Sequence, residues 1–285
     1  MADESSTDTI LRSARHLAAE SSAATGSDHL LTALVLHSEP VKELLDAFDV
    51  TPTVAAHVFR QGVPTRHTAP DVPFDSSATD LALLAALIHD DRSHAASLLA
   101  ECGVDAAEVR AAIASGHLPR RPDPIKPALR ECRDRLLGRR AFPGFRFRAF
   151  GIIPIKFNYA PAPLMWARWE ADLIAKGQWR RTRTDDVLVT MLGTFEVAAA
   201  YPHLIGPDPE VYAGTRRLLS AGLDHDQASA LSTAADLGTD AIRPSRLLSN
   251  PNREPRHTTH LLDMLHRNAD TRSARLLSLA LPAGW

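Results

Sequence analysis

Three histidines near the C-terminus, with an aspartate between them, are of residue types that bind metal ions: His257, His260, Asp263 and His266. Helical zinc sites in hydrolases carry a His-Glu-x-x-His pattern, in which the glutamate acts as general base. That glutamate is absent here, and His257 and His260 flank an expected helix start. The spacing therefore predicts no metal site.

The two cysteines are the only candidates for thiol chemistry. Cys102 ends an expected apolar helix and is most simply a core residue. Cys132 lies among arginines, which would favour a thiolate, but no general base is paired with it in the sequence. Two cysteines do not suggest a disulfide framework, so a reducing cytoplasm is the expected localisation.

Arginine and phenylalanine alternate in the segment 145–150, which contains Arg146 and Arg148. The arginines supply charge for phosphates and the rings supply surfaces for base stacking. The same alternation describes a short strand, and the stretch 155–159 repeats it, which predicts a small β-hairpin around 151–154. A helical DNA-binding or transcription-linked protein is therefore the alternative function. It takes second place because the rest of the chain shows no matching basic face.

Enzyme motifs are missing from the sequence. It has no Gly-x4-Gly-Lys-Ser/Thr phosphate loop, no Gly-x-Gly-x-x-Gly string and no Gly-x-Ser-x-Gly nucleophile elbow. Without the first of these, the backbone cradle and lysine that hold nucleotide phosphates are lacking. We therefore expect neither an enzyme nor a bound cofactor.

Composition indicates a soluble globular protein. The net charge of −2 gives no overall attraction to nucleic acid or to a membrane surface. No apolar run approaches the length of a membrane span, and the polar, acidic N-terminus is not typical of a signal peptide.

A recurring pattern predicts the helices that position these residues. A hydroxyl residue is followed by a polar pair and then by apolar residues at helical spacing, as an N-cap before a short buried helix requires. The copies begin at Ser27, Thr184 and Thr258. Each is followed by a segment that opens with a leucine pair and ends near a small or turn-forming residue, which predicts αα-hairpins. Such repetition predicts an all-α fold of repeated helical units.

The first of these units, residues 9–62, resembles the repeat in the N-terminal domain of ClpA/ClpC-type protein unfoldases. The Gly-Thr-Glu-His-Leu-Leu motif of that family is matched by Gly26-Ser27-Asp28-His29-Leu30-Leu31. The resemblance is good for the first unit, fair for the last, weak for the second and third, and absent from the middle of the chain. It implies two tandem all-helical modules, 1–116 and 163–285, joined by a basic, proline-rich linker at 117–162.

The second unit is short and leaves two alternatives. In one, Ala78 to Ile88 is the opening helix of the repeat and the capped second helix has been lost. In the other, Thr79-Asp80-Leu81 begins the capped helix and the opening helix has been lost. The distance to the pair Leu98-Leu99 favours the second alternative.

The resemblance also implies a ligand site. In the family, the glutamate of the motif faces the guanidinium of phosphoarginine, with helix-start amides near the phosphate. The matching position is Asp28 after Ser27 in the first unit, Asp185 after Thr184 in the third, and Thr259 in the fourth. Aspartate is shorter by one methylene, and threonine has no charge. Alternatively, Asp28 and Asp185 are first-turn carboxylates that interact with the helix dipole, each contributing less than ~1 kcal/mol.

The function implied by the resemblance is binding without catalysis. A Clp N-terminal domain without its ATPase would bind adaptors or substrates of the Clp protease, or the cyclic-peptide antibiotics that target the unfoldase. It would then act as a regulator or as a decoy. No membrane partner is expected.

Overall fold

The computed structural model describes residues 6–20, 23–62, 79–140, 158–248 and 257–282. Over these residues the protein is all-α, with α-helices, short 3-10 helices and no strand. The hairpin predicted around 151–154 and the arginines at 146 and 148 lie outside the described ranges. None of the helices in these ranges has both the length and the hydropathy needed to cross a membrane.

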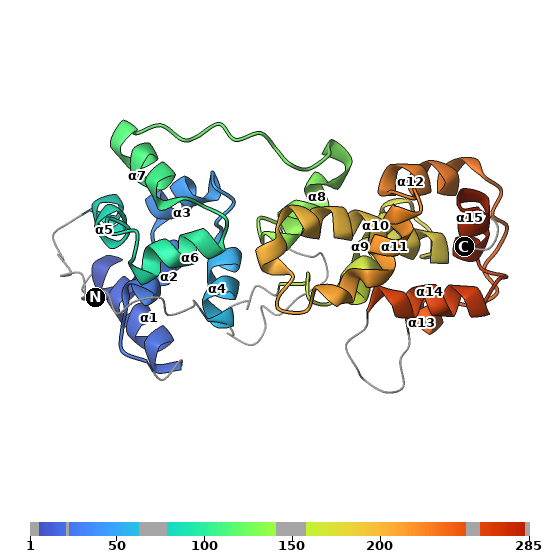
Figure 1. The fold of residues 1–285 in the computed structure, drawn as a ribbon, viewed down its shortest axis with the longest axis horizontal. Coiled ribbons are helices and arrows are strands. Elements are labelled where there is room, and N and C mark those ends of the chain that lie inside the picture. Colours follow the sequence, from blue (N-terminus) through green and yellow to red (C-terminus); the bar gives the residue numbers. More distant parts are fainter. Residues whose placement is uncertain (1–5, 21–22, 63–78, 141–157, 249–256, 283–285) are drawn as a thin grey trace. The chain divides into compact units, whose positions relative to one another are not determined.

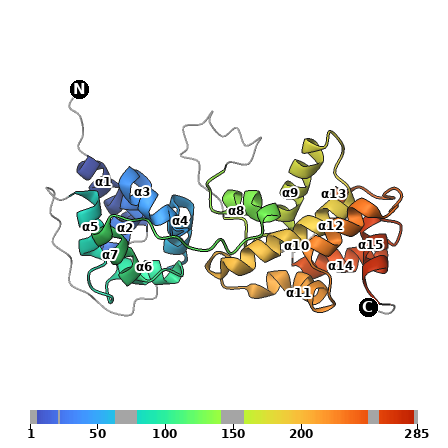
Figure 2. The same cartoon turned by 90° about the horizontal axis from the view of Figure 1, so that it is seen from above.

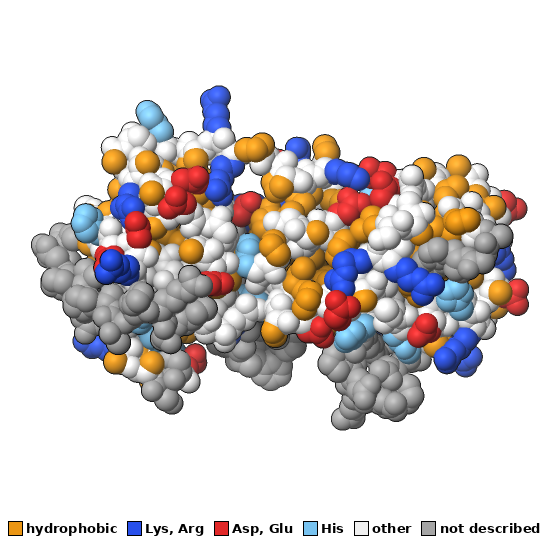
Figure 3. All heavy atoms as spheres, in the orientation of Figure 1, with side chains coloured by type: hydrophobic (Ala, Val, Ile, Leu, Met, Phe, Trp, Pro, Cys, Tyr) orange, Lys and Arg blue, Asp and Glu red, His pale blue; other side chains and the backbone are white. Residues whose placement is uncertain are grey.

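The described residues form two compact units. The first contains 6–123, 137–140 and 158, and the second contains 124–136 and 159–282. Residues of the segment 117–162, which sequence analysis assigns to a linker, are thus shared between the two units. The face drawn in Figure 3 carries basic and acidic side chains interspersed, consistent with the net charge of −2.

The helices of the first unit surround α2. They are α1 (Ser6–Glu20), α2 (Ser27–His37), α3 (Glu39–Asp46), α4 (Pro52–Gln61), α5 (Asp80–Leu87), α6 (His94–Glu101) and α7 (Ala106–Ser115). Helix α2 packs against α1, α3, α4, α5 and α6 (Figure 1). Every residue from His29 to Val35 is buried, because a helix that is apolar on all sides is stable only when it is enclosed.

The second unit surrounds α10 in the same way (Figure 2). Its α-helices are α8 (Arg130–Leu136), α9 (Pro163–Gly177), α10 (Thr184–Ala200), α11 (Ala213–Ser220), α12 (His225–Ala234), α13 (Pro244–Leu247), α14 (Thr258–Arg267) and α15 (Arg272–Ala280). Its 3-10 helices are η1 (Pro127–Leu129), η3 (Pro202–Leu204) and η4 (Pro209–Tyr212). Helices η3 and η4 lie in the connection between α10 and α11.

The two units repeat one pattern of helix contacts in the same chain order. Helix α10 packs against α9, α11, α12 and α15, as α2 packs against α1, α3, α4 and α6. Likewise α11 contacts α14 and α12 contacts α15, as α3 contacts α5 and α4 contacts α6. The two units therefore share these helix contacts, although α2 also packs against α5 whereas α14 packs against α9 and α13.

Helix α5 corresponds to α14 in this pattern. The side chain of Thr79 caps α5 by accepting a hydrogen bond from the amide of Ala82 at 3.3 Å. A threonine cap followed by packing against α3 is what the alternative with a lost opening helix requires. Residues 63–78, where an opening helix of the second unit would lie, are outside the described residues.

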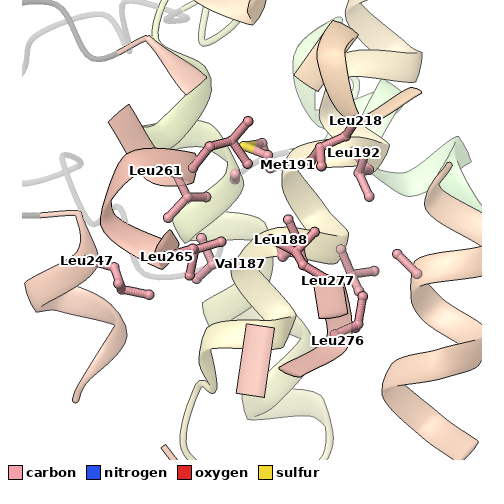
Figure 4. Packing of buried hydrophobic residues seen from close by; sticks show 14 of the residues in the cluster. Val187, Leu188, Met191, Leu192, Leu218, Leu247, Leu261, Leu265, Leu276 and Leu277 are labelled. Atoms are coloured by element: carbon pink, nitrogen blue, oxygen red, sulfur yellow. The ribbon is translucent and has the colours of Figure 1, made fainter. Parts of the chain in front are cut away.

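The core of the second unit is formed by aliphatic side chains around α10. Val187, Leu188 and Met191 face leucines of α14 and α15 (Figure 4). These α10 side chains are fully buried. Loss of two methylenes from such a position costs several kcal/mol, so this cluster sets the position of α10.

Helices α11 and α14 approach one another at a glycine. A Cβ atom on Gly214 would lie 2.5 Å from the carbonyl carbon of Thr258 and 2.5 Å from the amide nitrogen of Thr259. Both are backbone atoms, which cannot rotate away. The contact therefore requires glycine at this position.

We predict that Gly214→Ala destabilises the protein by about 1–3 kcal/mol, because α11 and α14 must separate to admit the methyl group. Gly177→Ala is the matched control. It also lies in a helix, but nothing stands within 4 Å of its added Cβ, so it should be neutral or stabilising. Urea unfolding followed by circular dichroism measures both. Equal effects of the two substitutions would contradict the packing explanation.

Candidate functional site

The start of α2 is tied to the start of α6. Ser27, the first residue of α2, accepts a hydrogen bond from the amide of Ala95 at its Oγ, over 3.1 Å. Ala95 is the second residue of α6. Two helix N-termini, each with partial positive charge, therefore meet beside Asp28.

Asp28 lies between two imidazoles. Its Oδ1 is 2.8 Å from Nδ1 of His29 and 4.0 Å from Nδ1 of His94, and 14% of its side chain is exposed. The amide of Gly26 also lies 3.1 Å from Nδ1 of His29 and donates to it. One Nδ1 cannot both accept from Gly26 and donate to Asp28. The tautomer and charge of His29 therefore determine which of the two contacts forms.

The corresponding helix start in the second unit makes the same backbone contact. Oγ1 of Thr184 accepts a hydrogen bond from the amide of Ser273 over 3.1 Å, and Ser273 is the second residue of α15. Here an additional carboxylate joins the two helix starts, because Asp240 accepts from the amides of both Thr184 and Arg272.

Asp185 occupies the position of Asp28, but its carboxylate is fully engaged. Arg272 donates to Oδ1 through Nε at 2.9 Å and to Oδ2 through a terminal nitrogen at 3.0 Å. The hydroxyl of Ser232 donates to Oδ2 at 2.8 Å. The side chain of Asp185 is 1% exposed and that of Arg272 is 11% exposed. The hydrogen bond with Asp185 raises the pKa of the Arg272 guanidinium.

The two sites also differ in the residue that faces the carboxylate. In each unit the residue that faces the carboxylate is the first residue of the helix whose second amide binds the hydroxyl. This residue is His94 in α6 and Arg272 in α15. Arginine forms a two-point contact, whereas the imidazole of His94 stays 4.0 Å away. The second unit thus contains an aspartate with its own bound guanidinium, and the first unit leaves the equivalent position without one.

At the start of α14, only the contact made by the hydroxyl group is present. Oγ1 of Thr258 accepts a hydrogen bond from the amide of Thr215 in α11 over 3.0 Å. Thr259, at the carboxylate position, is exposed and uncharged. This helix start therefore has no group that could pair with a cation.

Sequence analysis did not find Arg272, Asp240 or Ser232, because they lie 47 to 87 residues from their partners at the start of α10. One feature of the sequence could have indicated the ion pair of Arg272. Arg272 is a cation in the first turn of a helix, where the dipole disfavours positive charge. Such a residue requires a carboxylate from elsewhere in the fold.

A cavity of about 170 Å³ in the second unit contains the other notable cluster of polar side chains. Arg135 donates through Nε to both carboxylate oxygens of Glu170, at 2.9 and 3.1 Å, and Trp166 donates to Glu170 at 3.2 Å. Cys132 lines the same cavity, and burial, with a smaller effect of Glu170, raises the pKa of its thiol. A protonated thiol is a poor nucleophile, so this cavity gives no support to thiol catalysis.

The histidines near the C-terminus form no metal centre in the described part of the chain, where no three His, Cys, Asp or Glu side chains group as metal ligands. His257 instead approaches a carboxylate, with its Nε2 3.5 Å from Oδ2 of Asp208.

No protein-family model, curated protein or solved structure matches this chain.

We predict that Asp185→Asn destabilises the protein by about 3–5 kcal/mol, because it leaves the guanidinium of Arg272 partly buried without its counter-charge. Asp28→Asn should cost about 1 kcal/mol or less, since its partners are imidazoles and the loss is mainly the helix-dipole interaction. Thermal and urea unfolding of the two variants test this. A large loss in Asp28→Asn would show that the two sites are equally structural.

Both thiols should resist alkylation in the folded protein. Burial, with a smaller effect of Glu101, raises the pKa of Cys102 to about 12, and the pKa of Cys132 is also raised. A raised pKa keeps a thiol protonated at pH 8, and only the thiolate reacts. Mass spectrometry after iodoacetamide treatment should show neither cysteine modified natively and both modified in denaturant. Rapid native labelling of Cys132 would contradict this.

Proposed function

We propose that the protein is a non-enzymatic binding protein of the Clp protease system, built from two modules of the Clp N-terminal type. The supporting observation is that the motif Gly26-Ser27-Asp28-His29-Leu30-Leu31 begins the central helix of a unit whose helix contacts recur around α10. In both modules the hydroxyl at the start of the central helix binds the second amide of another helix.

In this proposal the binding residue is Asp28 and not Asp185. Asp185 is occupied by Arg272, whose guanidinium contacts both carboxylate oxygens. This internal contact also shows which chemical group suits an aspartate at such a helix start. A guanidinium from a ligand takes the corresponding place beside Asp28, where His94 stands 4.0 Å away.

The ligand proposed is an arginine that carries a phosphate on its side chain. The carboxylate of Asp28 pairs with the guanidinium, and the phosphate lies near the amides that open α2 and α6. Ser27 uses its oxygen to accept from Ala95, so its hydroxyl hydrogen remains able to donate to a phosphate oxygen.

A module that binds without an ATPase competes with the unfoldase for the same molecules. Such a protein acts as a regulator when the molecules are adaptors or substrates. It acts as a decoy when they are the cyclic-peptide antibiotics that target the unfoldase N-domain.

Calorimetric titration of the full chain with a phosphoarginine peptide tests the proposal. Asp28→Asn should weaken binding about ten-fold or more, the usual effect of losing a charge-assisted hydrogen bond. Asp105→Asn is the control: it removes the same charge from a helix start in the same unit, and Asp105 caps α7 with an oxygen that asparagine retains.

The peptide with unmodified arginine and a phosphoserine peptide show whether both groups are required. Unchanged binding in Asp28→Asn would exclude the site. No binding of phosphoarginine peptides, Clp adaptors or cyclic peptides would exclude the function.

A further inference from the structure

A groove of about 860 Å³ lies on the second unit, and five of its ten lining residues are basic. It lies where the last turns of α9, the chain 179–182 and the start of α13 come together. Its lining contains Arg168, Asp172, Lys176, Trp179, Arg181 and Arg243, among others.

Most of the positive charge in this groove is not neutralised. Arg168 lies 4.0 Å from Asp172, and Arg180 is paired with Asp186 at 2.5 and 2.7 Å. Lys176, Arg181 and Arg243 are exposed and form no ion pair with any described residue. Lys176 is in the last turn of α9, where the helix dipole favours a cation. Arg181 and Arg243 lie outside helices and have no such structural reason.

Trp179 stands at the end of α9 in a conformation that tryptophan rarely adopts. Its φ is +53° and its side chain is 97% exposed. The amide of Trp179 donates to the carbonyl of Lys176, and that of Arg180 donates to the carbonyl of Ala175, each over 3.1 Å. This pair of bonds is a Schellman motif, whose left-handed residue is usually glycine because a Cβ atom there costs roughly 1–2 kcal/mol.

Neither packing nor backbone geometry therefore explains the indole. Glycine would end the helix with less strain, and a smaller polar residue would expose less apolar surface to water. A strained, exposed aromatic beside unpaired cations indicates a surface selected for a ligand.

We propose that this groove binds single-stranded nucleic acid. A base stacks on the exposed face of Trp179, and phosphates pair with Lys176, Arg181 and Arg243. Stacking on an aromatic beside a line of cations is the usual chemistry of binding that is independent of sequence. An acidic peptide would satisfy the cations but supplies no planar ring for the indole, so nucleic acid fits the observations better. This inference is independent of the proposed Asp28 site.

The test is fluorescence anisotropy of the full chain with a fluorescein-labelled oligothymidylate of ten nucleotides. Three phosphate contacts predict that affinity falls roughly 20-fold between 50 and 200 mM salt. Arg181→Gln with Arg243→Gln should flatten this salt dependence. Arg92→Gln with Arg120→Gln, which removes the same charge from exposed sites in the first unit, should leave it unchanged.

Trp179→Gly separates function from structure. It removes the left-handed strain, so the melting temperature should stay the same or rise, while affinity for the oligonucleotide falls roughly ten-fold or more. A residue kept for folding would show a lower melting temperature instead. Trp179→Phe should retain part of the affinity, since phenylalanine still offers a ring.

Three results would overturn the proposal. The first is no anisotropy change at 50 mM salt. The second is binding that persists unchanged in the Arg181→Gln, Arg243→Gln variant, which would place it elsewhere on the chain. The third is a labelled polyglutamate peptide that binds more tightly than the oligonucleotide with the same dependence on Trp179, which would assign the groove to an acidic protein segment.

Discussion

Each unit depends on how the buried start of its central helix is satisfied. Helices α2 and α10 are enclosed by their neighbours, so the amides and polar side chains of their first turns have little access to water. A buried polar group without a partner destabilises a fold by about 1–3 kcal/mol. Ser27 and Thr184 meet this constraint by accepting from backbone amides 68 and 89 residues further along the chain. The same bonds join α2 to α6 and α10 to α15.

The carboxylate that follows the hydroxyl residue is a second group that requires a partner. At Asp185 the partner is a guanidinium from the same chain, which makes the site part of the structure. At Asp28 the facing side chain is an imidazole, which is shorter and has no fork of donors. The carboxylate of Asp185 is thus closed by Arg272 and Ser232 of the same chain, whereas the facing histidine at Asp28 stands 4.0 Å away.

Surface and core follow different constraints in the second unit. Around α10, close packing determines residue type: aliphatic side chains fill the space, and glycine at 214 lets two backbones touch. At the end of α9 the constraint is reversed, because the backbone favours glycine and tryptophan is present. A departure from local preference is informative there because no packing contact compensates for it.

The sequence alone determined the all-α character of the chain and the starts of its main helices. Apolar spacing is a local signal, so Ser27, Thr184 and Thr258 could each be placed at a helix start from their neighbours in the chain. The prediction that they are N-caps was wrong: the N-cap positions are Gly26, Arg183 and His257, and the hydroxyls bind amides of other helices. The burial of α2 and α10 could also be predicted, because these two helices are apolar on nearly every side.

Only the tertiary structure decided which of these helix starts have a partner for their carboxylate. Arg272 and Asp185 are 87 residues apart, and nothing in the local pattern at either position specifies the other. The groove around Trp179 likewise combines residues from α9, the following turn and α13. Helix formation depends on interactions within a few residues, whereas the surroundings of a side chain depend on how distant helices pack, and that packing is set by the fold as a whole.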